Sequence, residues 1–375
     1  MTLVQMASQD TSAITAEKSA ITVMVVDDSA VIRGLITRML EAERGICVIS
    51  TAANGEHAIR ELKRHPADVI VLDLEMPVMD GLTAIPGLLA VEPRAKILIA
   101  STLSTRNAEI SLRCLQAGAA DYLPKPTSNR SIIDGGDGGN DFRSELIRKV
   151  RSLGEPRSIQ SKDRIAYPKP GAPVHLRSQS ATPPEVLAIG SSTGGPQALL
   201  KLFRALGRDF ALPVLLTQHM PASFTSILAG HITSQTGFAC TEARNGEQVM
   251  PRHAYIAPGG IHMTVQRNAF GAIIKLDDGP PENFCRPAVD PMLRSIARCY
   301  GARALTVILT GMGSDGARGG REIVAAGGTV IAQDEETSVV WGMPGAAAAA
   351  GICSALMPID QLAQWILKAT IGPKT

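Results

Sequence analysis

Short apolar runs alternate with amphipathic segments in the first part of the chain, and this alternation limits its fold more than any other feature. Each run precedes residues with helical spacing. The predicted strands are residues 21–26, 47–53, 69–73, 95–101 and 119–123. The predicted helices are about residues 30–43, 55–65, 81–91, 107–117 and 142–153. Such alternation gives a parallel sheet with helices on both faces. The pattern therefore predicts a flavodoxin-like (βα)5 domain with strand order 2-1-3-4-5.

The composition is that of a globular protein with room for two domains. Its 375 residues are 45% hydrophobic and 19% charged, with a net charge of +2. An aromatic content of 3% argues against a base-stacking surface for nucleic acid. The chain has neither a long apolar run nor a signal peptide, so we expect a cytoplasmic protein that does not insert into a membrane. Six scattered cysteines without a C-x-x-C pair predict reduced structural thiols and no zinc site.

The sequence divides into four predicted segments. Residues 1–20 are polar and predict a disordered leader, and the alternating pattern assigns residues 21–153 to a first domain. Glycines near residues 134–140 predict a flexible insertion within that domain. Prolines, serines and basic residues dominate residues 154–184, and this density favours a flexible, solvated linker over a site for nucleic acid or membrane. Residues 185–375 form the second predicted domain.

Three aspartates follow two strands that are neighbours in the first predicted sheet. Asp27 and Asp28 come directly after the first strand, and Asp73 ends the third. The carboxyl ends of parallel strands meet at one edge, so these carboxylates gather there. They repel one another unless a divalent cation lies among them, and hard oxygen ligands favour Mg2+. The alternative is that Asp27, Asp28 or Ser29 caps the next helix and that Asp73 only ends a strand.

Two further polar residues close neighbouring strands at the same edge. Ser101 ends the fourth predicted strand, and Lys125 lies directly before Pro126 at the end of the fifth. A metal ion, a hydroxyl and an ammonium around one carboxylate are the parts of a phosphoryl-accepting site.

With this set of residues, the segment 21–126 resembles the receiver domain of bacterial response regulators. The resemblance implies that the three aspartates hold Mg2+ and that Asp73 accepts the phosphoryl group. It further implies that Ser101 moves toward the phosphate and that Lys125 pairs with it. Tyr122 occupies the aromatic position that follows this movement inward in the family.

A second set of strand-to-helix turns carries a serine, a histidine and a carboxylate. One buried strand ends in Gly190-Ser191-Ser192-Thr193-Gly194, which satisfies the G-x-S-x-G pattern centred on Ser192. Two later buried strands end shortly before His219 and Asp315. Right-handed crossovers make these strands parallel, so the three side chains emerge at one edge. We expect a doubly wound, mostly parallel Rossmann-like sheet with an antiparallel hairpin.

These three residue types are those that a serine hydrolase needs. His219 can take the proton of Ser192 while Asp315 orients the imidazole, and the amides around Gly311-Met312-Gly313 can receive an oxyanion. Other interpretations stay open on the residues alone. His219 can lie in the core or cap a helix, Asp315 can cap the next helix, and the two glycine-rich turns can bind a dinucleotide.

Several ordered segments make residues 185–370 similar to the catalytic domain of the chemotaxis protein-glutamate methylesterases. The segments are Ile189–Gly195, Gln218–Pro221, Ala254–Gly259 with His262, Arg286–Pro287 with Val289–Asp290, Leu309–Gly316 and Gly342–Pro344. The resemblance implies a nucleophile, a general base and an orienting carboxylate, namely Ser192, His219 and Asp315. It also implies one oxyanion donor and two residues that line the cleft, namely the Met312 amide, Thr193 and His262.

The family's two-domain order implies a phosphorylation-activated esterase in chemotaxis adaptation. Such an enzyme hydrolyses glutamate methyl esters on chemoreceptors and often deamidates receptor glutamines. A chemotaxis histidine kinase phosphorylates the receiver with the help of Mg2+, the esterase reaction needs no cofactor, and the unphosphorylated receiver packs over the catalytic cleft. The other hypothesis is a receiver-controlled binding module or phosphate sink without catalysis, against which the retained serine, histidine and aspartate argue.

Overall fold

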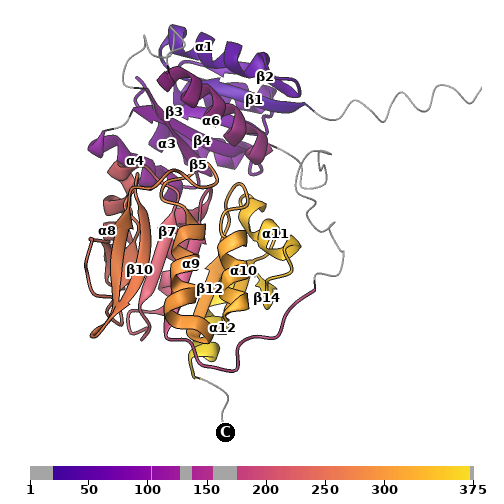
Figure 1. Ribbon diagram of the computed structural model, residues 1–375. Coiled ribbons are helices and arrows are strands. Elements are labelled where there is room, and N and C mark those ends of the chain that lie inside the picture. Colours follow the sequence, from indigo (N-terminus) through magenta and orange to yellow (C-terminus); the bar gives the residue numbers. More distant parts are fainter. Residues whose placement is uncertain (1–19, 103, 127–136, 155–174, 372–375) are drawn as a thin grey trace, which may run out of the picture. The chain divides into compact units, whose positions relative to one another are not determined.

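The computed structural model describes residues 20–102, 104–126, 137–154 and 175–371. The described chain forms two compact units, each with its own parallel sheet (Figure 1). Within these ranges, no helix is both long and apolar enough to cross a membrane. All six cysteines are free thiols, as the sequence predicted.

The first unit is a five-stranded parallel sheet in the order β2-β1-β3-β4-β5. Its strands are β1 (Ile21–Val26), β2 (Ile46–Ala52), β3 (Val69–Asp73), β4 (Lys96–Thr102) and β5 (Asp121–Lys125). The intervening helices are α1 (Ala30–Glu41), α2 (Gly55–Arg64), α3 (Gly81–Val91) and α4 (Thr105–Gln116), and α6 (Asp137–Gly154) follows β5. Helix α1 packs beside α6, and α2 packs beside α3. This order confirms the predicted flavodoxin-like fold.

Helix α6 corrects the predicted glycine-rich insertion. The sequence placed a flexible segment near residues 134–140, but α6 begins at Asp137 and so includes residues 137–140. Glycine lowers helix propensity by about 1 kcal/mol per residue without excluding it from a helix, and a long helix packed on a sheet tolerates that cost. The remaining residues of that segment lie outside the described ranges, as does all but the last residue of the predicted leader.

The second unit contains a seven-stranded sheet in the order β14-β13-β12-β6-β7-β9-β8, with every pair parallel. Its strands are β6 (Val186–Ser191), β7 (Val214–Gln218), β8 (Cys240–Glu242), β9 (Ala254–Ile256), β12 (Ala304–Ile308), β13 (Thr329–Gln333) and β14 (Ala355–Met357). An antiparallel hairpin consists of β10 (His262–Asn268) and β11 (Gly271–Asp277). The predicted Rossmann-like sheet with a hairpin is confirmed.

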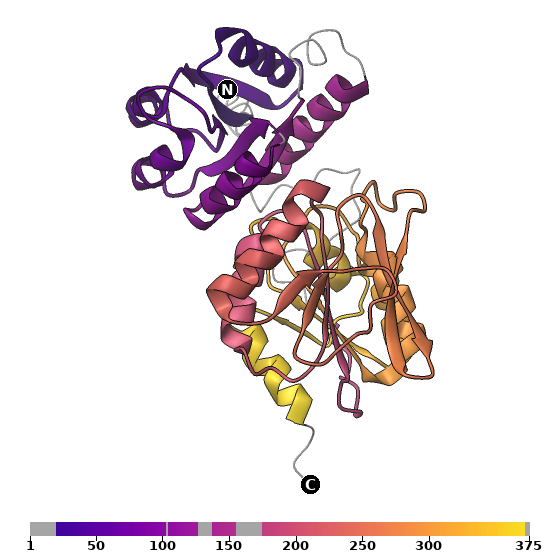
Figure 2. The same cartoon turned by 90° about the vertical axis from the view of Figure 1, so that its left-hand side faces the viewer.

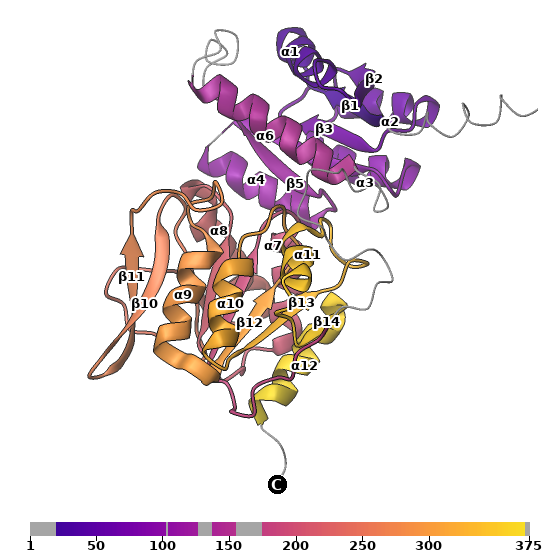
Figure 3. The same cartoon turned by 45° about the vertical axis from the view of Figure 1, so that its right-hand side comes forward.

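Helices cover both faces of this second sheet (Figure 2). They are α7 (Gly195–Leu206), α8 (Ala222–Thr236), α9 (Val289–Tyr300), α10 (Ala317–Ala325), α11 (Gly342–Ala349), α12 (Ile359–Ile371) and the short 3-10 turn η1 (Gly301–Arg303). Helix α7 packs beside α8 and α12, whereas α9 packs beside α10 and α11 contacts β12 and β13 (Figure 3). Strands β6, β7 and β12 are therefore buried on both faces, which explains their continuous apolar sequences.

The side of the sheet to which the chain adds strands changes at β6. From β6 the chain adds β7, β9 and β8 on one side, and it later returns to add β12, β13 and β14 on the other. Ligand sites of open parallel sheets lie beyond the carboxyl ends of the strands at such a reversal. The fold thus places the loops that follow β6, β7 and β12 at the position where a site is expected.

One end of the predicted linker belongs to the second unit. The Arg177 amide donates to the Cys353 carbonyl at 2.9 Å, and the Ser180 amide donates to Thr329 Oγ1 at 2.8 Å. The Ser180 hydroxyl also donates to the Ala302 carbonyl at 2.9 Å. These bonds correct the prediction of a flexible, solvated linker over residues 154–184 at its C-terminal end, because polar side chains and amides there find partners on the sheet's neighbours. Residues 155–174 lie outside the described ranges.

Candidate functional site

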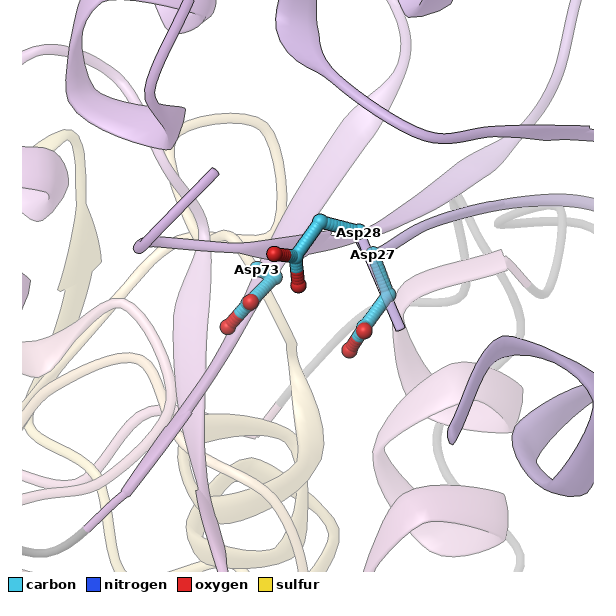
Figure 4. A group of neighbouring side chains, drawn as sticks. All are labelled: Asp27, Asp28 and Asp73. Carbon is cyan, nitrogen blue, oxygen red and sulfur yellow. The ribbon is translucent and has the colours of Figure 1, made fainter. Parts of the chain in front are cut away.

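The aspartates predicted at the edge of the first sheet lie together. The carboxylates of Asp27, Asp28 and Asp73 offer ligand atoms within 4.8 Å of one another (Figure 4). Asp27 and Asp73 are buried, whereas Asp28 is exposed. The Ser29 side chain accepts the Ile32 amide and caps α1, so the helix does not need either aspartate as its cap. Hard oxygen ligands with one side open to water fit Mg2+, which usually keeps several waters.

Lys125 neutralises part of this negative charge. Its ammonium donates to Asp27 Oδ2 at 2.6 Å and to Asp73 Oδ1 at 2.7 Å. Burial raises the pKa of Asp73, and the charge of Asp27 adds to this, while Lys125 opposes the rise. Asp73 is therefore a buried carboxylate bonded to an ammonium, with two other carboxylates within 4.8 Å.

The other two predicted receiver residues are both buried, Ser101 near the carboxyl end of β4 and Tyr122 near the start of β5. Ala100 pairs with Asp73 across β3 and β4, and Ser101 is the next residue of β4. Tyr122 is 5% exposed and therefore points inward, and burial raises the pKa of its phenol well above its usual value. The Lys149 ammonium lies 5.6 Å from the Tyr122 ring centroid. No local sequence pattern marks this cation, because Lys149 lies on α6 and is distant from Tyr122 in the chain.

The turn after β6 separates the two adjacent serines. Ser191 is fully buried, and its hydroxyl donates to Gln218 Oε1 at 2.7 Å. Gln218 Nε2 in turn donates to the Ser192 carbonyl at 3.0 Å, while the Ser192 side chain stays partly exposed. A Cβ at Gly195 would lie 2.0 Å from Gln218 Oε1, so this position needs glycine. The turn thus uses one serine for structure and leaves the other open to a substrate.

His219 and Asp315 form a direct pair. His219 follows β7, and its Nε2 lies 2.8 Å from Asp315 Oδ2. The His219 amide also donates to the Ser191 carbonyl at 3.1 Å, which joins the turn after β7 to the turn after β6. Ser192 and His219 both lie in the described part of the chain. No hydrogen bond joins the Ser192 hydroxyl to either ring nitrogen of His219 there. Such catalytic contacts often tighten only when substrate binds.

The Asp315 carboxylate is almost completely buried and is saturated with donors. Oδ2 accepts the Val289 amide at 2.6 Å, and Oδ1 accepts the Asp290 amide at 3.0 Å, both at the N-terminus of α9. Oδ1 also accepts the Gly316 amide at 3.0 Å and Asn283 Nδ2 at 2.8 Å. Burial alone raises the pKa of Asp315, but the bond to His219 and these amides outweigh burial and hold the pKa below its usual value.

The imidazole of His219 is correspondingly stabilised in its charged form. Burial by itself lowers the pKa of His219, whereas the charge of Cys285 and the bond to Asp315 raise it, and the pKa is about 10. Cys285 Sγ lies 3.4 Å from His219 Nδ1. The sequence predicted only a structural role for this thiol, since no local pattern links Cys285 to a histidine 66 residues away.

The loop after β12 passes close to the Ser192 turn. A Cβ at Gly311 would lie 2.8 Å from Ser192 Cβ, so the loop passes directly beside the serine. The Gly311 amide donates to the Val340 carbonyl at 3.0 Å and is therefore not available to an oxyanion. The Gly311 amide therefore leaves the set of predicted oxyanion donors.

The two residues predicted to line the cleft are both buried. Thr193 is 2% exposed, and its carbonyl accepts the Thr310 hydroxyl at 2.9 Å. His262 is 3% exposed, its Nε2 donates to the Pro280 carbonyl at 3.0 Å, and its Nδ1 accepts the Ala288 amide at 3.1 Å. With both ring nitrogens bound to backbone, His262 holds the two ends of the segment between β11 and α9. Whether or not it also lines the cleft, the two ring nitrogens of His262 are bound to backbone atoms.

Two polar residues near the site had no role in the sequence analysis. Asp290 is fully buried and accepts the Gly316 and Gly319 amides at 3.0 and 2.7 Å, at the N-terminus of α10. Asn283 Nδ2 bridges Asp290 Oδ2 and Asp315 Oδ1, at 2.9 and 2.8 Å. Asp290 lies in the first turn of α9, but its carboxylate accepts amides at the start of α10, so no local sequence signal marks these contacts, and nothing local marks Asn283.

Comparison with known proteins assigns each unit to a protein family. The family model for the CheB methylesterase matches residues 187–366, and that for the response regulator receiver domain matches residues 23–135. The chain is 52% identical to protein-glutamate methylesterase/protein-glutamine glutaminase 1 of Paramagnetospirillum magneticum over 93% of this chain and 96% of that protein. It is 55% identical to the protein-glutamate methylesterase/protein-glutamine glutaminase of Azospirillum brasilense over 92% of each. The CheB methylesterase catalytic domain of Thermotoga maritima is 37% identical, with a TM-score of 0.49, over 50% of this chain and 99% of that one.

The Asp315–His219 pair makes a prediction about the pKa of the imidazole. Replacing Asp315 with asparagine removes the negative charge beside Nε2, and since that charge raises the pKa of His219, the pKa falls. We expect a decrease of about one to three pH units, measured by NMR titration of the imidazole nitrogens. Asp278→Asn, which changes an exposed carboxylate, serves as the control and leaves the titration unchanged. A folded Asp315→Asn protein with an unaltered His219 titration would contradict the assignment.

Proposed function

Because the chain belongs to the CheB methylesterase family and carries a response regulator receiver domain, we propose that it demethylates glutamate methyl esters on chemoreceptors under the control of receiver phosphorylation. The observation that carries the proposal is the Asp315–His219 pair beside the open Ser192 turn. The relatives' names also include glutaminase activity, so we extend the proposal to receptor glutamines. These names favour an enzyme over a binding module or a phosphate sink.

Ser192 attacks the ester carbonyl in the proposed reaction. His219 takes the hydroxyl proton as the bond from Ser192 Oγ to the carbonyl carbon forms, and Asp315 stabilises the resulting imidazolium. The Met312 amide, beside Ser192 in the loop after β12, receives the oxyanion. The imidazolium then returns its proton to the departing methoxide, and methanol leaves. Water, activated by the same imidazole, hydrolyses the acyl-serine; with a glutamine substrate the group that leaves is ammonia.

The receiver supplies the control. Asp73 accepts the phosphoryl group from a histidine kinase, and Lys125 contacts the carboxylate that becomes phosphorylated. Asp27, Asp28 and Asp73 would hold Mg2+, which when bound neutralises charge on the transferring phosphoryl oxygens. Ser101 and Tyr122 are the buried hydroxyl and the buried aromatic side chain that respond to phosphorylation of Asp73. A kinase donor and chemoreceptor tails as substrates place the proposed reaction in the cytoplasm.

Removal of the Ser192 hydroxyl tests the nucleophile. We expect Ser192→Ala to lower methanol release from methylated receptor membranes by at least about 10^4-fold, because no acyl-enzyme can form. Ser191→Ala is the matched control, since it removes only the hydrogen bond to Gln218, and we expect a loss of less than about tenfold. Near-normal release by Ser192→Ala together with a large loss in Ser191→Ala would move the role to the neighbouring serine.

Replacement of Asp73 tests the phosphoacceptor. An asparagine at position 73 keeps the shape of the side chain but cannot form the acyl phosphate, so we expect no label from a radioactive acyl-phosphate donor with Mg2+. Glu75→Gln changes an exposed carboxylate two residues away and retains full labelling. Label that persists in a folded Asp73→Asn protein would show that another residue accepts the phosphoryl group.

A further inference from the structure

The Cys285 thiol contacts Nδ1 of His219, the ring nitrogen that must act as the base in the proposed reaction. A carboxylate only accepts hydrogen bonds, so the neutral imidazole carries its proton on Nε2, which faces Asp315 Oδ2 at 2.8 Å. The basic lone pair then lies on Nδ1, and this is the atom that must take the proton of Ser192. In the structure Nδ1 contacts Cys285 Sγ at 3.4 Å, and a thiol donates its proton there.

The charged form of the pair leads to the same result. When the imidazole takes the thiol proton, Nδ1–H faces a thiolate, and the charge of Cys285 contributes to the high pKa of His219. An imidazolium has no lone pair on either nitrogen. In both protonation forms, therefore, contact with Cys285 leaves His219 unable to accept the proton of Ser192.

The turn that carries Cys285 is firmly built. The amides and carbonyls of Glu282 and Cys285 bond to each other at 2.9 and 3.1 Å, and the Glu282 carboxylate pairs with Arg294. Between them, Asn283 and Phe284 adopt left-handed backbone with φ of 51° and 62°. Non-glycine residues hold this conformation only where the surroundings determine it, and Asn283 is fixed by its bonds to Asp290 and Asp315.

We propose that Cys285 caps His219 Nδ1 in the resting enzyme and competes with Ser192 for the general base. This inference rests on the catalytic roles proposed above for Ser192 and His219. Cys285 is a positioning residue in this account: it acts on the base, and it must leave Nδ1 before acylation. A thiol is a weak hydrogen-bond donor, so the cap reduces the reactive fraction of the enzyme by a modest factor of about three to ten.

The rate at which a fluorophosphonate labels the full-length chain tests the cap. We expect Cys285→Ala to label about three to ten times faster than the wild type at neutral pH. The acidic limb of its rate–pH profile moves to lower pH, because the charge that raises the pKa of His219 is gone and the imidazole is free of its proton at lower pH. Cys299→Ala removes another half-buried thiol, whose Sγ contacts the Val265 carbonyl at 3.5 Å, and keeps the wild-type rate and profile.

Mass spectrometry separates failure of the cap from failure of the proposed catalytic site. Label on Ser192 with the same rate and profile in wild type and Cys285→Ala overturns the cap alone, and so does slower labelling of a folded Cys285→Ala protein. Label on another residue of the wild type overturns the serine assignment and the cap with it.

Discussion

The site of the second unit depends on the hydrogen bonds that the buried Asp315 carboxylate accepts. This carboxylate accepts hydrogen bonds from His219, from Asn283 and from three backbone amides, two of which open α9. A buried charge is stable only with such compensation, and a helix N-terminus supplies both donors and a favourable dipole. The same bonds connect the loops after β7, β11 and β12. The orientation of the imidazole is therefore fixed by the packing of several elements before any substrate arrives.

The two sites show how surroundings decide what an aspartate does. Asp73 and Asp315 both lie at the carboxyl edge of a parallel sheet, and both are buried. Burial dominates at Asp73 and raises its pKa, while amide donors and an imidazole dominate at Asp315 and lower its pKa. Asp73 also has two neighbouring carboxylates and a lysine, which suit metal-assisted phosphoryl transfer. Asp315 accepts hydrogen bonds from backbone amides, an asparagine and an imidazole, which suits the support of a positively charged imidazole.

The sequence was sufficient for the residues that stand at strand ends. Ser192, His219, Asp315 and Asp73 follow apolar runs with strong strand signals, so topology alone brought them to the correct edges. The contacts made by Asn283 and Cys285 come from a turn with no periodic pattern, and they depend on packing against residues distant in the chain. The family resemblance predicted that His262 lines the cleft, but it did not predict that both ring nitrogens bond to backbone atoms of the segment between β11 and α9. Sequence patterns thus predicted positions along strands and missed how the intervening loops fold over them.

The chain combines a receiver domain with a methylesterase domain, and the central proposal is that phosphorylation of the first controls the second. The most direct test is methanol release from methylated receptor membranes by the full-length chain, with and without an acyl-phosphate donor and Mg2+. The account predicts faster release when the donor is present, in step with phosphorylation of Asp73. Equal rates with a fully phosphorylated receiver would contradict the account.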